Sequence, residues 1–123
     1  MIYLILFTIL SGICEAAYFH IRQEGVTRFK YEHYYLTVLR ATVFIPFGLT
    51  YGWLLMGSAV LIFPFLHDGV YYTVRNIMRP GTYTKHFFDY STQSTAIFTL
   101  TFPVRLILAL VGLLIPYIYD SIL

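Results

Sequence analysis

The sequence predicts an all-α integral membrane protein: one membrane domain over residues 1–123, with four transmembrane helices in an antiparallel bundle and both termini non-cytoplasmic. Three observations predict this class. The chain is 59% hydrophobic and 11% charged, with a mean hydropathy of +0.71, values outside the range of soluble domains. Its apolar runs match the roughly 20 residues that a helix needs to cross a bilayer. Its basic residues gather in alternate connections between these runs.

The first predicted span covers residues 2–19. This run resembles the apolar part of a secretory signal peptide, but it lacks the basic residues that precede such a segment, so we expect it to be retained as a helix. The single cysteine, Cys14, lies within it. With one cysteine in the chain, a disulfide framework and a multi-cysteine zinc site are both excluded.

The next apolar segment, residues 33–76, is about twice as long as one span requires, so it must break once. The sequence GLTYG at 48–52 is the best place, because it combines two glycines with an aromatic residue of interfacial type. Gly48 and Gly52 also match the GxxxG helix-contact pattern. Their position near the centre of an overlong segment favours a turn, with predicted spans at 33–49 and 52–76.

The fourth predicted span covers residues 92–119. It follows a turn signal, RPG at 79–81, and Asp89 or Ser91 is suited to cap its first turn. Pro103 is expected to kink this helix.

Basic residues predict the orientation of these spans. They lie between the first and second spans and between the third and fourth, whereas the opposite side carries none in its loop or tail. Because basic residues favour cytoplasmic loops, both termini are expected to face away from the cytoplasm. The residues concerned are Arg22, Arg28, Lys30, Arg75, Arg79 and Lys85.

Ionisable side chains also occur inside the predicted spans, where an unpaired charge costs at least about 2.5 kcal/mol and usually marks a site. A rise of about 1.5 Å per residue places most of them in the cytoplasmic half of the bundle, with Arg105 near the midplane. Asp68, Tyr71 and Arg75 share one helix face at spacings of three and four. The predicted polar cluster comprises Glu15, Arg40, His67, Asp68, Tyr71, Arg75 and Arg105.

Histidine and carboxylate side chains in this half also permit a divalent metal as a cofactor. His86 and Asp89, three residues apart, would suit one side of such a site if that segment is helical, and His67 with Asp68 could supply further ligands. The sequence contains no HExxH motif and no paired ExxH motif.

The start of the chain loosely resembles the small multidrug resistance transporters, four-helix proteins with an essential glutamate in their first span. The matching residues are Glu15, Glu24, Gly25, Thr27, Arg28 and, more distantly, Tyr51 and Trp53. The resemblance implies a dimer that exports cationic compounds. Arg40, His67 with Asp68, and Arg105 do not belong to that family's pattern, and the spacing from Glu15 to Trp53 is too short for it.

Three functions therefore stay open. In the first, Glu15 and Asp68 neutralise Arg40 and Arg105, and the protein is a structural or assembly component of a membrane or membrane complex. In the second, it is a membrane-embedded enzyme, metal-dependent or using acid and base groups, that acts on a lipid or on a phosphorylated or carboxylated substrate. In the third, it is a proton-coupled transporter that uses Glu15.

The expected partners are the lipid bilayer and either further copies of the chain or a larger membrane complex. The net charge of +2 and the scatter of the basic residues speak against nucleic acid. The expected location is a cytoplasmic membrane or a virus-associated membrane.

Overall fold

The computed structural model of the chain describes residues 1–23, 32–89 and 100–122. Within these ranges the structure is helical and contains no strand, so the all-α prediction is confirmed. Several residues used in the predictions lie outside the described ranges: Glu24, Gly25, Thr27, Arg28, Lys30, Ser91 and the first eight positions of the predicted span 92–119.

Four α-helices make up most of the described chain. They are α1 (Ile2–Gln23), α2 (Glu32–Tyr51), α3 (Trp53–Met78) and α4 (Phe102–Ile122). Among them, α1 (over Ile2–Ile21), α3 and α4 are long and apolar enough to cross a membrane, which is consistent with an integral membrane protein. α2 has 20 residues and is therefore long enough, but it is less apolar than the other three.

The chain turns between α2 and α3 at Gly52, inside the predicted sequence GLTYG. Gly52 has a φ of +104°, a conformation that residues with a Cβ atom rarely adopt. Four residues earlier, a Cβ atom on Gly48 would lie 2.7 Å from the Trp53 ring. The two glycines thus serve the turn, one by its backbone conformation and one by leaving room for the first side chain of α3.

The start of the fourth helix differs from the prediction. α4 begins at Phe102, so Pro103 lies in the first helical turn, where its missing N–H has no partner to lose and no kink results. Asp89 does not cap this helix. Its carboxylate instead accepts a hydrogen bond from the backbone N–H of Lys85, just before the short 3₁₀ helix η1 (His86–Phe88).

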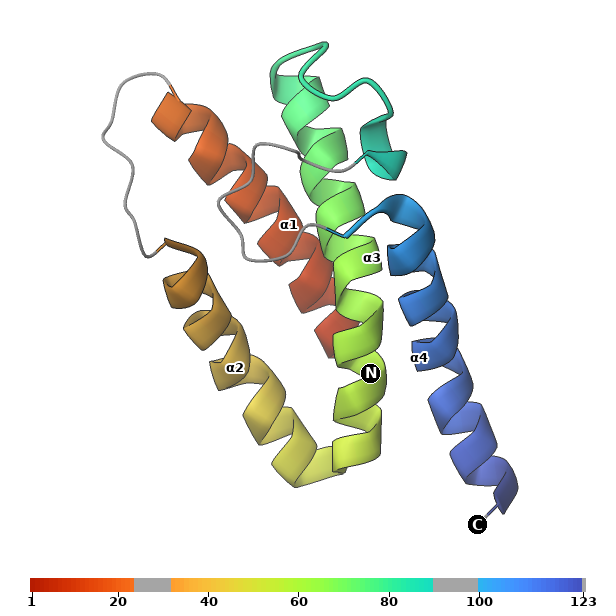
Figure 1. Cartoon of the computed structure of the whole chain (residues 1–123). Coiled ribbons are helices and arrows are strands. Elements are labelled where there is room, and N and C mark those ends of the chain that lie inside the picture. The colour runs from red at the N-terminus through yellow and green to blue at the C-terminus, as the bar shows by residue number, and fades with distance from the viewer. Residues whose placement is uncertain (24–31, 90–99, 123) are drawn as a thin grey trace.

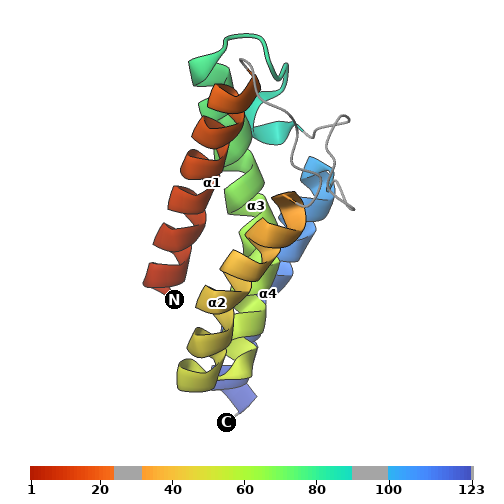
Figure 2. The same ribbon diagram turned by 90° about the vertical axis from the view of Figure 1, so that its left-hand side faces the viewer.

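α3 lies at the centre of the arrangement and contacts α1, α2, α4 and η1. Figures 1 and 2 show α1 and α3 running in one direction and α2 and α4 running in the other, with α2 and α4 on different sides of α3. α4 packs mainly on α3, so it is peripheral to the other three helices.

Two glycines allow close packing against α3. A Cβ atom on Gly12 of α1 would lie 2.8 Å from the backbone oxygen of His67, and one on Gly112 of α4 would lie 2.7 Å from that of Ser58. The Ser58 hydroxyl donates a 2.6 Å hydrogen bond to the Gly112 carbonyl oxygen. Small residues let the backbones of membrane helices approach closely. In lipid no hydrophobic effect drives helices together, so this close van der Waals packing contributes to their association.

The half of the molecule that contains the α2–α3 turn is apolar. Its core contains Leu4, Phe44 and Ala59, from α1, α2 and α3, and partly buried phenylalanines pack around them. The Phe44 ring makes edge contacts with Phe7 at 6.1 Å and with Phe63 at 5.7 Å between ring centroids. Most ionisable side chains of the helices therefore lie toward the opposite end.

Candidate functional site: a charge network across three helices

The carboxylate of Glu15 is the meeting point of three helices. Its Oε2 accepts a hydrogen bond from Nη2 of Arg40 in α2, and it lies 2.9 Å from Nε2 of His67 in α3. The side chains of Glu15 and His67 are 9% and 5% exposed. One buried oxygen of α1 is thus shared by groups from both neighbouring helices.

The imidazole of His67 contacts a second carboxylate at its other nitrogen. Nδ1 lies 3.0 Å from Oδ1 of Asp68, whose side chain is 29% exposed. The ring stacks on Phe63, with 4.7 Å between centroids. The arrangement fixes the ring plane from its face and from both nitrogens, so His67 has little freedom to reorient.

Arg40 approaches this group from α2. Its Nη2 lies 3.1 Å from His67 Nε2 as well as bonding Glu15, and its guanidinium lies 4.9 Å from the centroid of Phe63. A cation over an aromatic face gains electrostatic stabilisation in addition to its ion pair. We call Glu15, Arg40, His67 and Asp68 the charge network.

Arg105 belongs to a neighbouring group. Its side chain is fully buried, and Nη2 donates to the backbone oxygens of Phe87 at 3.0 Å and Asp89 at 2.7 Å. Asp68 and Asp89 are close enough to act on it electrostatically, but Nη2 of Arg105 donates its hydrogen bonds to backbone groups. Arg105 therefore attaches the start of α4 to the segment that contains η1.

Tyr71 and Arg75 continue along α3 beyond the charge network. The Tyr71 ring contacts Phe19 of α1 at 6.1 Å and Tyr83 at 6.4 Å between centroids. Arg75 is buried one turn further on. The predicted cluster is thus divided: Glu15, Arg40, His67 and Asp68 are in direct contact, whereas the other three members occupy the adjoining end of the bundle.

The candidate metal ligands do not assemble into a site. Among the residues that the structure describes, no group of three or more His, Cys, Asp and Glu side chains is arranged to hold a metal ion. Nδ1 of His86 lies 2.9 Å from the Asn76 amide nitrogen, and Asp89 bonds the backbone of Lys85. We therefore assign no metal site to His67, Asp68, His86 or Asp89.

Two further residues organise this end of the molecule and were not singled out from the sequence. The Asn76 side chain donates to the Tyr83 carbonyl oxygen at 2.6 Å and accepts from the Tyr83 N–H at 2.7 Å. Gly69 faces Phe87, whose ring would lie 2.1 Å from a Cβ atom at that position. We call residues 79–89 the return segment, because after Met78 the chain folds back along α3. The sequence signal for this packing was Asn76, a polar residue near the end of an apolar helix.

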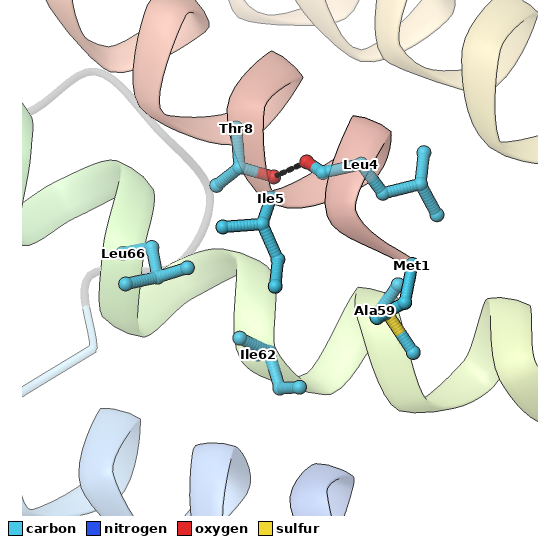
Figure 3. Close-up of a pocket in the computed structure, with 7 residues that line it drawn as sticks. All are labelled: Met1, Leu4, Ile5, Thr8, Ala59, Ile62 and Leu66. Carbon is cyan, nitrogen blue, oxygen red and sulfur yellow. Dashed lines mark hydrogen bonds between the residues drawn. The ribbon is translucent and has the colours of Figure 1, made fainter. Parts of the chain in front are cut away.

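A small pocket lies between α1 and α3, and its lining includes no residue of the charge network (Figure 3). It has a volume of about 10 Å³, and its lining is apolar apart from Thr8, which bonds the backbone oxygen of Leu4 at 2.7 Å. Such a space holds no more than about one water molecule. Its other lining residues are Met1, Leu4, Ile5, Ala59, Ile62 and Leu66.

The chain matches no protein-family model, no curated protein and no solved structure.

Proposed function

We propose that the protein is a structural or assembly component of a membrane or membrane complex, with four transmembrane spans and both termini non-cytoplasmic. The charge network holds its first three helices in one register. Cytoplasmic and virus-associated membranes are the proposed locations, and the proposed partners are lipid together with further copies of the chain or a larger membrane complex.

The observation that carries the proposal is the sharing of one Glu15 oxygen by Arg40 and His67. Arg40 faces the opposite charge of Glu15 on another helix, and His67 lies between the carboxylates of Glu15 and Asp68. Intramembrane charges generally pair in this way. Breaking such a pair strands a buried charge, so it fixes which helices meet and at what height.

The path of α2 supports a fourth span. α2 joins α3 through the single residue Gly52 and then runs back beside it, so Arg40 and Phe44 reach partners on α1 and α3. If α3 crosses the bilayer, α2 passes through the same depth. Its lower apolarity is then explained by Arg40, whose charge is neutralised inside the bundle.

The length of α4 supports the placement of the charge network near the cytoplasmic boundary. Its 21 residues extend about 32 Å, close to the roughly 30 Å of the hydrocarbon core. Its first residue, Phe102, contacts Phe65 of α3 at 6.0 Å between ring centroids. Phe65 precedes His67 by less than one helical turn, so the network lies near the level at which α4 begins.

Replacing the central ion pair by apolar side chains tests the structural role. The variant Glu15→Leu with Arg40→Met removes both charges together and leaves His67 beside Asp68. Buried ion pairs are often replaceable by well-packed apolar groups without loss of stability. We expect native mass spectrometry of membrane-extracted protein to give the same assembly mass as the wild type. A folded double variant that no longer assembles would contradict the proposal.

A further inference from the structure

We propose that the group formed by Glu15, His67 and Asp68 binds one additional proton. The reference state is a neutral His67 imidazole between two ionised carboxylates. This site for a stored proton rests on the charge network of the proposed function, but it concerns the chemical state of the network and not its role in assembly.

The two contacts of the imidazole carry the argument. Nε2 lies 2.9 Å from Glu15 Oε2, and Nδ1 lies 3.0 Å from Asp68 Oδ1. A neutral imidazole has one N–H and one bare nitrogen. In either tautomer, the lone pair of the bare nitrogen would face a carboxylate oxygen at hydrogen-bond distance. Both contacts become hydrogen bonds only when a further proton is present.

The additional proton has three alternative positions. It lies on the ring, which then donates from both nitrogens, or on Glu15, which donates to Nε2, or on Asp68, which donates to Nδ1. Moving it between these groups breaks one N–H or O–H bond and forms another, so the count of protons is unchanged.

Among the four side chains of the charge network alone, charge balance supports the same count. With the extra proton, the two carboxylates are matched by Arg40 and one further positive charge, and the network is neutral. Without it, the network carries a net negative charge among side chains that are largely buried. A net charge in such surroundings is costly, whereas a balanced set is tolerated.

The position of Arg40 is compatible with this state. Its Nη2 lies 3.1 Å from Nε2 of His67, so a ring with a bare Nε2 could accept a hydrogen bond from Arg40. That lone pair would still lie 2.9 Å from the Glu15 oxygen, whereas with the extra proton Arg40 and His67 both donate to this oxygen. The other nearby groups are Tyr71, which interacts electrostatically with Glu15 and Arg75, and Arg105, which interacts with Asp68 and Asp89.

The site links the packing of α1 on α3 to proton binding. Loss of the stored proton at higher pH would turn a ring lone pair toward a carboxylate and leave the network negative. Because the folded state keeps this proton to higher pH than the unfolded chain does, the stability that it provides is present at lower pH and lost as pH rises.

Nitrogen and carbon NMR of the full chain in lipid nanodiscs tests the proton count. Replacing His20, His33 and His86 by Gln leaves His67 as the one imidazole. At about pH 8, where an ordinary imidazole is neutral, we expect either a ring with two N–H groups and two ionised carboxylates, or a ring with one N–H group beside one protonated carboxyl group. A neutral ring between two ionised carboxylates would overturn the proposal.

A variant pair adds a readout that a purely structural role would not change. In Asp68→Asn the amide N–H can face Nδ1, so the ring needs only one proton and should become neutral with N–H at Nε2. The matched control Asp120→Asn removes an exposed carboxylate at the far end of α4 and should leave the extra proton in place. An unchanged protonated ring in Asp68→Asn with Glu15 ionised would contradict the assignment. Failure here, with assembly intact in the Glu15→Leu, Arg40→Met variant, would overturn the stored proton and leave the proposed function standing.

Discussion

Arg40 of α2 donates a hydrogen bond to the Glu15 carboxylate of α1, and this contact joins two helices that otherwise meet mainly through α3. The same carboxylate oxygen is 2.9 Å from His67 of α3. On the proposed function, the register of all three helices depends on this acidic side chain.

Glu15→Gln should destabilise the protein more than Asp68→Asn. Removing the Glu15 charge takes the ion-pair partner from Arg40 and one of two carboxylate contacts from His67. Losing one partner of a fully buried pair costs about 3–5 kcal/mol, and the 25% exposure of the Arg40 side chain lowers this cost. Asp68 is more exposed and bonds one partner, His67, so its loss should cost no more than about 1.5–3 kcal/mol. Unfolding by SDS in mixed micelles measures both. A larger loss of unfolding free energy for Asp68→Asn than for Glu15→Gln would contradict this prediction.

Gly12→Ala should separate α1 from α3. The new methyl group would lie 2.8 Å from a backbone oxygen, which cannot rotate away as a side chain could. Overpacking of this kind costs about 1–3 kcal/mol. Gly57→Ala in α3 is the matched control, because nothing lies within 4 Å of a Cβ atom there. Equal unfolding free energies for the two variants would rule out the close approach of α1 and α3.

Asn76→Ala should release the return segment. The side chain holds both the N–H and the carbonyl oxygen of Tyr83, and an unsatisfied backbone group costs about 1–3 kcal/mol. We expect the Tyr83 amide hydrogen to exchange with solvent at least about fivefold faster, as such a loss implies. Thr82→Ala removes a hydroxyl that bonds the exposed carbonyl of Arg79 and serves as the control. Unchanged Tyr83 exchange in Asn76→Ala would show that the asparagine does not hold the segment.

Cysteine labelling tests the four spans and their orientation. In a Cys14→Ser background, single cysteines replace Arg28, Thr50, Lys85 or Asp120. A membrane-impermeant maleimide should label positions 50 and 120 in intact cells, and positions 28 and 85 only after permeabilisation. Labelling of position 28 together with 50 would remove α2 as a span, and the inverse pattern overall would reverse the orientation.

The membrane class and the meeting of opposite charges could be predicted from the sequence, because both follow from the cost of placing charges in hydrocarbon. Composition and run length indicated helices, and two glycines in an overlong segment indicated the turn at Gly52. The pairing of Glu15 with Arg40 needed only the rule that intramembrane charges find partners. The hydrogen-bond partners of Arg105 did not follow, because its Nη2 donates to two backbone carbonyls and not to Asp68.

The return segment shows why the rest could not be predicted. The sequence around residues 79–89 has ordinary turn residues, and nothing in it indicates that the Phe87 ring packs on Gly69. That contact depends on the height at which the chain leaves α3 and on Asn76, which bonds across seven residues. The hydrogen bond from Ser58 to Gly112 likewise joins residues far apart in the sequence. The pattern of residues within a single helix does not indicate such a contact.

The coupling energy between Glu15 and Arg40 shows whether their ion pair joins α1 to α2. It is obtained from the unfolding free energies of the wild type, Glu15→Gln, Arg40→Gln and the double variant in one lipid or micelle system. We predict a coupling of about 1–3 kcal/mol, as for residues in one ion-pair network, so that the double variant loses less stability than the two single variants together. Losses that add within about 0.5 kcal/mol would show that Glu15 and Arg40 do not interact, and that the charge network does not hold the helices together.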